Sequence, residues 1–160
     1  AIAENNYGNP DQALDYLQRM TRSFSYAFPG SMYEVSPDYG MMVQAWNIYS
    51  FAVPIVRQFF GIEPMASRKE IRIRPQMPSA WDRATLEHVM IGENRISIYY
   101  EATDTDGKTI RIRQEKGDWK ILFKPQDADT GSVEVTKGQV IETGDWLVQC
   151  TGEEIQITYR

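Results

Sequence analysis

The feature that most constrains this chain is an apolar run from Met41 to Phe60, which stops at Gly61. About 14 of its 20 residues are apolar. The positions that break the run are spaced three or four residues apart: Gln44, Asn47, Ser50, Pro54 and Arg57. This spacing predicts a helix with one narrow polar stripe and apolar faces elsewhere. Such a helix needs neighbours on most sides. We therefore expect helix 41–60 to form a homodimer contact or to pack against the remainder of a longer parent protein.

A first helix is predicted ahead of this run, over residues 9–27. Asn9 is a favourable N-cap, and Pro10 suits the first helical position because the missing N–H is not needed there. Within the apolar run, Pro54 predicts a kink or a break, since proline removes a helical hydrogen bond. Gly61 is the expected C-cap of the second helix.

After Pro64 the pattern changes from a helical period to alternation of apolar and polar residues, as in TIRIR at 109–113 and IQITY at 155–159. Alternation predicts strands with one buried face and one solvated face. Turn signals separate the candidate strands, which are 69–75, 84–91, 94–101, 108–114, 118–124, 131–136, 139–142, 145–150 and 154–159. Short strands at regular spacing predict an antiparallel β-sandwich. We therefore predict an α+β fold, with a helical hairpin over residues 1–64 and a C-terminal β-sandwich domain over residues 65–160.

Charge and composition bear on several classes of function. The net charge is -5 and the acidic residues are spread along the chain, which argues against a nucleic-acid partner. Polar residues within the run 41–60 favour a buried helix over a membrane span, so no membrane partner is expected. The start, AIAENNYGN, has neither the features of a signal peptide nor an initiating Met, as expected of a processed or excised chain.

The two residue types most often used as nucleophiles or metal ligands occur once each. Cys150 lies in a strand-like run, and we predict a small buried hydrophobe there rather than a nucleophile. His88 is the single histidine, which argues against a zinc site and against a Ser-His-Asp triad. We therefore predict no metal and no cofactor.

The most suggestive carboxylate is Glu34, which lies between Tyr33 and Val35 in a loop rich in Gly, Pro and Ser, with Tyr39 nearby. Loops held by rigid elements commonly carry catalytic groups. A carboxylate beside aromatic rings suits a sugar site, because the rings pack on the sugar while the carboxylate acts as acid or base. The alternative is that Glu34 is one more solvated loop residue.

Three residues at the start of the apolar run extend this candidate site. Gln44, Trp46 and Asn47 could face a polar cavity and bind sugar hydroxyl groups. Alternatively, Trp46 belongs to the core, and Gln44 and Asn47 satisfy neighbouring backbone groups.

Two weaker signals lie in the β part. Residues 104–107, DTDG, are similar to part of a calcium loop, but their place between two alternating runs favours a hairpin turn. Trp81, Trp119 and Trp146 could stack on sugars, and the alternative for each is packing in the core.

The motifs from residue 30 to about residue 101 follow a recognisable order. The chain reads GSMYEV, then MMVQAWNIYSFAVPIVRQFFGIEP, then KEIRIRPQMP, SAW and IGENRISIYYE. This order resembles the C-terminal end of six-hairpin glycoside hydrolases, which have an (α/α)6 barrel. Bacterial α-L-rhamnosidases show a similar progression, although Val35 and Ala45 stand where their pattern has Arg and His. The triplet 44–46, Gln-Ala-Trp, is similar to glycogen-debranching amylo-α-1,6-glucosidases.

The resemblance implies that Glu34 is the general base of an inverting glycosidase. We predict that Tyr33, Tyr39, Gln44 and Trp46 contact the carbohydrate substrate. The partner acid is expected upstream in the barrel, outside this chain, so the chain alone should be inactive. The predicted function is therefore the C-terminal fragment of a glycoside hydrolase that removes a sugar from an oligo- or polysaccharide with inversion. The alternatives are a non-catalytic carbohydrate-binding β-sandwich module and a structural domain whose helices form a subunit interface.

Overall fold

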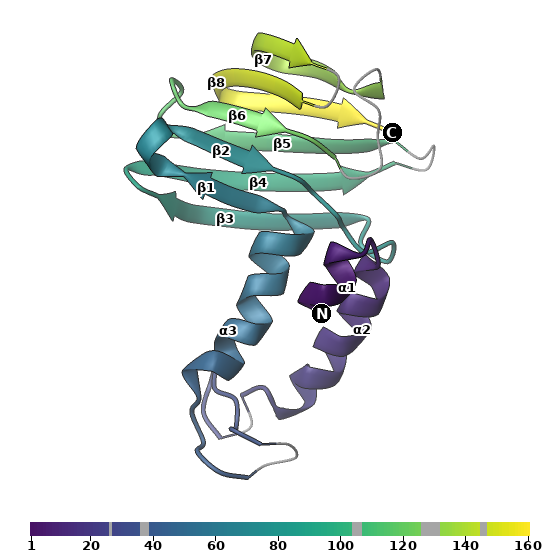
Figure 1. The fold of residues 1–160 in the computed structure, drawn as a ribbon, viewed down its shortest axis with the longest axis vertical. Helices are drawn as coiled ribbons and strands as arrows, with labels where there is room; N and C mark the ends of the chain where they lie inside the picture. Colours follow the sequence, from purple (N-terminus) through teal and green to yellow (C-terminus); the bar gives the residue numbers. More distant parts are fainter. Residues whose placement is uncertain (26, 36–38, 104–106, 126–131, 145–146) are drawn as a thin grey trace.

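The computed structural model has helices at one end of a strongly curved sheet, an α+β arrangement that confirms the predicted fold class (Figure 1). The structure describes residues 1–160 except 26, 36–38, 104–106, 126–131 and 145–146. The helical elements are α1 (Ile2–Asn6), α2 (Pro10–Met20), η1 (Thr21–Ser23), α3 (Ala45–Val53), η2 (Pro54–Phe59) and η3 (Ala66–Arg68). The strands are β1 (Ile62–Met65), β2 (Glu70–Ile73), β3 (Arg83–Ile91), β4 (Asn94–Ala102), β5 (Lys108–Gln114), β6 (Lys120–Phe123), β7 (Glu134–Gly144) and β8 (Leu147–Tyr159).

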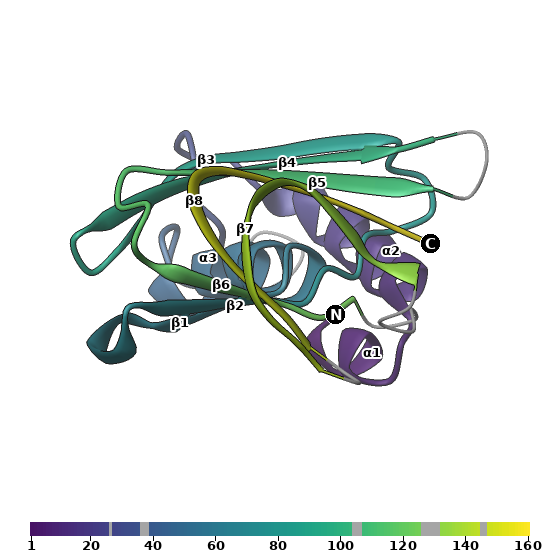
Figure 2. The same cartoon turned by 90° about the horizontal axis from the view of Figure 1, so that it is seen from above.

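The described strands form one sheet in the order β1-β2-β6-β8-β5-β4-β3, with β7 paired to β8. The sheet curls until its two halves face each other, and Figure 2 shows this nearly closed, sandwich-like shape. Every pair is antiparallel except β2 and β6, which run parallel with Ile71 opposite Ile121. This parallel pair differs from the all-antiparallel prediction. A parallel pair requires a crossover connection between its two strands. Here β3, β4 and β5 lie between β2 and β6 in the sequence and form that connection.

The core lies between the two halves of the sheet and consists largely of isoleucine. The runs in which isoleucine alternates with polar residues contribute those isoleucines to this core, because side chains on one strand point to opposite faces in turn. The isoleucines with no exposed surface are Ile71, Ile73, Ile96, Ile98, Ile110, Ile112, Ile121, Ile155 and Ile157. The alternation therefore identified the buried face of the sheet correctly.

The last two strands differ from the prediction in length. Four short strands were expected over residues 131–159, but β7 and β8 are continuous through them. The predicted turn at residues 151–153 is a bend within β8, which pairs with β6 at Cys150 and with β5 at Ile157. Gly152 has φ +140° at this bend, and Gly138 of β7 has φ +106° beside it. Glycine allows the paired strands to pass from one half of the sheet to the other (Figure 2).

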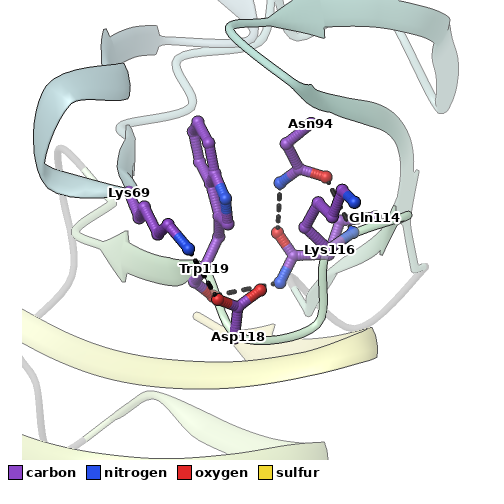
Figure 3. Close-up of polar contacts among 6 residues, drawn as sticks. All are labelled: Lys69, Asn94, Gln114, Lys116, Asp118 and Trp119. Carbon is purple, nitrogen blue, oxygen red and sulfur yellow. Dashed lines mark hydrogen bonds and ion pairs between the residues drawn. The ribbon is translucent and has the colours of Figure 1, made fainter.

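A buried amide pair holds the end of the sandwich where β5 leads into β6 (Figure 3). The Asn94 side chain donates to Gln114 Oε1 at 2.9 Å, and its own Oδ1 accepts the Lys116 N–H at 2.9 Å. Gln114 Nε2 donates to the carbonyl groups of Trp119 at 3.1 Å and Gly152 at 2.8 Å. Trp119 is buried, so the core alternative is confirmed for this tryptophan. The network ties the β5–β6 connection to both neighbouring strands.

The first long helix, α2, begins as predicted and ends early. Asn9 is its N-cap and Pro10 its first residue, but the helix stops at Met20 rather than continuing to residue 27. The Thr21 hydroxyl donates to the Gln18 carbonyl at 2.6 Å, and a short 3-10 turn follows. Serine and threonine side chains that bond nearby backbone groups compete with the helical ladder, which explains the early end.

The second long helix is also shorter than predicted. α3 begins at Ala45, because its N-cap Gln44 is extended and the Gln44 N–H donates to the Met32 carbonyl of the preceding loop. A kink or a break was predicted at Pro54, and there the helix changes from α to the wider π form of η2 without ending. Gly61 follows with φ +66°, as expected of a C-cap. The sheet then begins at Ile62, three residues before the predicted start of the second domain.

Candidate functional site

The predicted site loop covers residues 30–40. Its described residues, 30–35 and 39–40, lie at the end of the helices that is far from the sandwich (Figure 1). Its two sides pair as a small hairpin. Val35 and Tyr39 exchange two backbone hydrogen bonds of 3.0 Å, and the Glu34 N–H donates to the Met41 carbonyl at 2.9 Å. The hairpin therefore places two predicted site residues, Glu34 and Tyr39, on one small structural unit.

The Glu34 carboxylate is held through one of its oxygens. Oε2 accepts the Met41 N–H at 3.2 Å, while no hydrogen bond to Oε1 occurs within the described residues. Gly40 has φ +81°, and a Cβ there would lie 2.7 Å from Oε2 and 3.0 Å from the Glu34 Cβ. Glycine thus lets the carboxylate lie against the backbone of the opposite hairpin side. The Glu34 residue as a whole is exposed.

Asn47 joins the hairpin to helix α3. Its side-chain amide donates to the Tyr33 carbonyl and, at 3.2 Å, to the Glu34 carbonyl. The Gln44 N–H donates to the Met32 carbonyl at 3.2 Å on the same side of the loop. Asn47 therefore satisfies neighbouring backbone groups, one of the two alternatives that the sequence left open. Its position one turn into an otherwise apolar helix was the available signal for this supporting role.

The residues predicted to contact the carbohydrate differ in how accessible they are. Tyr39 and Trp46 are exposed, by 77% and 62%, and Tyr33 is half-buried. Trp46 is therefore not a core residue, which removes the alternative proposed for it. Gln44 is only 4% exposed, so its side chain offers little to a ligand in this conformation. The loop and the start of helix α3 thus bring the carboxylate of Glu34, an exposed residue, and the exposed rings of Tyr39 and Trp46 to the same end of the molecule.

These rings are among the exposed apolar side chains of the loop, the residues beside it and helix α3, which we together name the loop surface. Its members are Phe28, Val35, Tyr39, Met41, Met42, Val43, Trp46 and Tyr49. The prediction that the whole polar stripe of this helix faces water is wrong in part, because Gln44 and Pro54 are buried. Helix α3 instead turns Phe51 inward, where its ring stacks on Phe24 at 5.2 Å between centroids. Soluble monomers rarely expose apolar areas of this kind without a partner or ligand.

Other candidate groups have structural roles. Cys150 is fully buried, with Sγ 3.8 Å from the Ile121 carbonyl, and burial raises the pKa of its thiol to about 12. The prediction of a buried hydrophobe rather than a nucleophile is therefore confirmed. Among the described residues, no group of three or more His, Cys, Asp or Glu side chains is placed to hold a metal ion. No helix in the described part of the chain is both long and apolar enough to cross a bilayer.

The remaining weak signals have separate outcomes. Trp81 is partly buried and meets Phe59 edge to face at 5.2 Å, beside the small helical core of Ala13 and Leu17. Packing is therefore its structural role. Residues 104–106 of the candidate turn, and Trp146, lie outside the described residues.

Gly40→Ala is expected to release the Glu34 carboxylate. An alanine Cβ would overlap Oε2, so we expect the Met41 N–H to lose its partner and to exchange with solvent about tenfold faster. Gly30→Ala is the matched control, because Gly30 also has positive φ, at +76°, yet nothing lies within 4 Å of a Cβ there. Hydrogen exchange by NMR measures both variants. Equal Met41 exchange in the two would contradict the proposed role of Gly40.

Comparison with known proteins gives a structural relationship alone. No protein-family model matches the sequence, and no curated protein matches it. The fold is similar to part of a solved structure, Streptomyces avermitilis α-L-rhamnosidase complexed with L-rhamnose, with a TM-score of 0.54 and 15% sequence identity. The match covers 94% of this chain and 15% of the rhamnosidase chain. At this identity the comparison shows a similar fold and nothing beyond it.

Proposed function

We propose that this chain is the C-terminal part of a glycoside hydrolase that removes a sugar from an oligo- or polysaccharide with inversion. The observation that carries the proposal is the placement of Glu34. Glu34 is exposed, its carboxylate is anchored at Oε2 by the Met41 N–H, and it lies on the same loop and helix start as the exposed rings of Tyr39 and Trp46. The likeness of the fold to part of a rhamnosidase supports the same conclusion.

In this proposal Glu34 acts as the general base. Its Oε1 takes a proton from the water that attacks the anomeric carbon, while a carboxylic acid outside this chain protonates the leaving oxygen. In inverting enzymes the two carboxyl groups are roughly 6.5–9.5 Å apart, which leaves room for the water. The rings of Tyr39 and Trp46 would pack on the apolar face of the sugar. A chain that supplies only one of the two carboxyl groups should not hydrolyse a glycosidic bond.

The proposal is tested by comparing this chain with a longer protein that includes the residues encoded before Ala1. Both would be assayed on a panel of nitrophenyl glycosides that includes an α-L-rhamnoside. We expect hydrolysis by the longer protein alone, with the first-formed sugar inverted at the anomeric carbon, as followed by NMR. Retention of configuration, or turnover by the isolated chain, would overturn the assignment.

The loop surface leads to a proposal about association. We expect the isolated chain to dimerise through the region of helix 41–60, since burial of apolar surface contributes about 25 cal/mol per Å2. In the longer enzyme the barrel would instead cover the part of this surface that lies outside the sugar contacts of Tyr39 and Trp46. Light scattering at tens of micromolar decides the matter: a clean monomer of 18.4 kDa would contradict it.

Two matched variants test whether the dimer contact lies on the loop surface. Tyr49→Ser removes an exposed ring from the loop surface and should weaken the dimer about tenfold or more. Met90→Ser removes a side chain of similar exposure from strand β3 and should leave the dimer unchanged. An equal effect of the two variants would place the contact elsewhere.

A further inference from the structure

A separate cavity lies at the opposite end of the helices, where α1 and η2 meet the β1–β2 hairpin. Its volume is about 350 Å3, within the range of small-ligand sites. The residues that matter for its chemistry are Asn5, Arg57, Glu63, Arg74 and Gln76. It lies at the sandwich end of the helices and shares no lining residue with the site loop.

Two buried side-chain amides beside this cavity have unsatisfied polar atoms. Asn5 is 1% exposed, and neither atom of its amide has a hydrogen-bond partner within the described residues. Gln76 is also buried, and its Nε2 likewise has no partner there. The backbone N–H groups of both residues are already bonded, to Ala1 and Phe59. Burying an amide without a partner is unfavourable, so its presence calls for a ligand or an equivalent partner.

The charge of the cavity is positive. Neither Arg57 nor Arg74 forms an ion pair within the described part of the chain, whereas Glu63 pairs with Arg72 at 3.5 Å. Arg57 belongs to η2, the π-helical segment that begins at Pro54. Such segments are rare and frequently occur at functional sites. The lining therefore combines two unpaired guanidinium groups with unsatisfied amide donors.

We propose that this cavity binds a small carboxylate ligand. A guanidinium group presents paired N–H donors that match the two oxygens of a carboxylate, and the Asn5 and Gln76 amides would supply further donors. A neutral sugar ring fits less well, because none of the described lining residues is aromatic. A free organic acid and a uronic acid sugar share the required chemistry.

Isothermal titration of the chain at low salt tests the proposal with three probes: malonate, D-galacturonate and neutral D-galactose. We expect saturable binding of at least one acid and no binding of galactose. Binding of malonate alone identifies a free organic acid as the ligand class, and tighter binding of galacturonate identifies an acidic sugar. If neither acid binds, the cavity holds only water and the proposal fails.

Variants locate the binding. Arg57→Gln and Arg74→Gln should each weaken the acid about tenfold or more, whereas Arg68→Gln, an exposed arginine outside the cavity, should leave affinity unchanged. Asn5→Leu should weaken binding and also raise Tm, because it removes the unsatisfied amide. A purely structural Asn5 would lower Tm instead. Unchanged affinity in the Arg57, Arg74 and Asn5 variants would overturn the proposal.

Discussion

Glu34→Gln is expected to lower kcat of the longer enzyme about 10²- to 10⁴-fold, the usual contribution of a general base. The amide cannot take a proton from the attacking water. Its oxygen can still accept the Met41 N–H that now binds Oε2 at 3.2 Å, so the hairpin should keep its shape. The loss should therefore fall on kcat, with little change in KM, because ground-state contacts to the sugar remain.

The matched control for this variant is Glu4→Gln. Glu4 also accepts a hydrogen bond from an amide, Asn9 Nδ2 at 3.1 Å, but it lies on α1, at the sandwich end of the helices. Its replacement should leave kcat within about twofold, since exposed substitutions away from special features have small effects. Steady-state kinetics and Tm are measured for both variants. Near-normal turnover by Glu34→Gln, with an unchanged Tm, would end the proposal that Glu34 is the base.

The sandwich was predictable because its determinants are local. Alternation of isoleucine with charged or polar residues fixed which face of each strand is buried, as in 109–113 and 155–159. The bend of β8 was not predictable, because Gly152 in sequence looks the same in a turn and in a bent strand. Which of the two forms depends on pairing with Gly138 and with strands far away in the chain. The parallel pairing of β2 and β6 depends on the same long-range order.

In the candidate site, too, the local features were predictable and the features that depend on distant contacts were not. Glu34 and its neighbouring aromatic residues were visible because residue type and loop composition are local properties. The supporting roles of Gly40 and Asn47 were not, since both depend on contacts across the hairpin and with α3. The face of the helix was predicted wrongly for a related reason. Periodicity shows that a polar stripe exists, but packing against Phe24 and the loop decides that Gln44 is buried and Trp46 exposed.

The second large effect is expected at Gly61, where the helices join the sheet. Gly61→Ala should lower the free energy of unfolding by more than about 4 kcal/mol, a loss reserved for severe packing or backbone conflicts. Gly61 has φ +66°, which alone costs a residue with a Cβ about 1–2 kcal/mol. The new Cβ would also lie 1.9 Å from the Arg74 carbonyl oxygen and 2.2 Å from its carbon.

The overlap between the new Cβ and the Arg74 backbone cannot be removed by a small local movement. The clashing atoms are backbone rather than the end of a flexible side chain, and the Arg74 N–H donates to the Gly61 carbonyl at 3.0 Å. Moving either segment would break that bond and disturb the buried pair that follows, Ile62 opposite Ile73. A typical domain is stable by about 5–15 kcal/mol, so the variant should be largely unfolded at modest urea concentrations.

A paired series separates the two causes. Asparagine tolerates positive φ better than alanine, so Gly30→Asn should be nearly neutral, and Gly30→Ala should cost about 1–2 kcal/mol, because a Cβ at Gly30 meets no atom within 4 Å. At Gly61 both substitutions should be severe, since both introduce the Cβ. Urea unfolding followed by circular dichroism measures the four variants. If Gly61→Asn proved as mild as Gly30→Asn, backbone conformation alone would explain the glycine, and the close approach of Arg74 would not limit this junction.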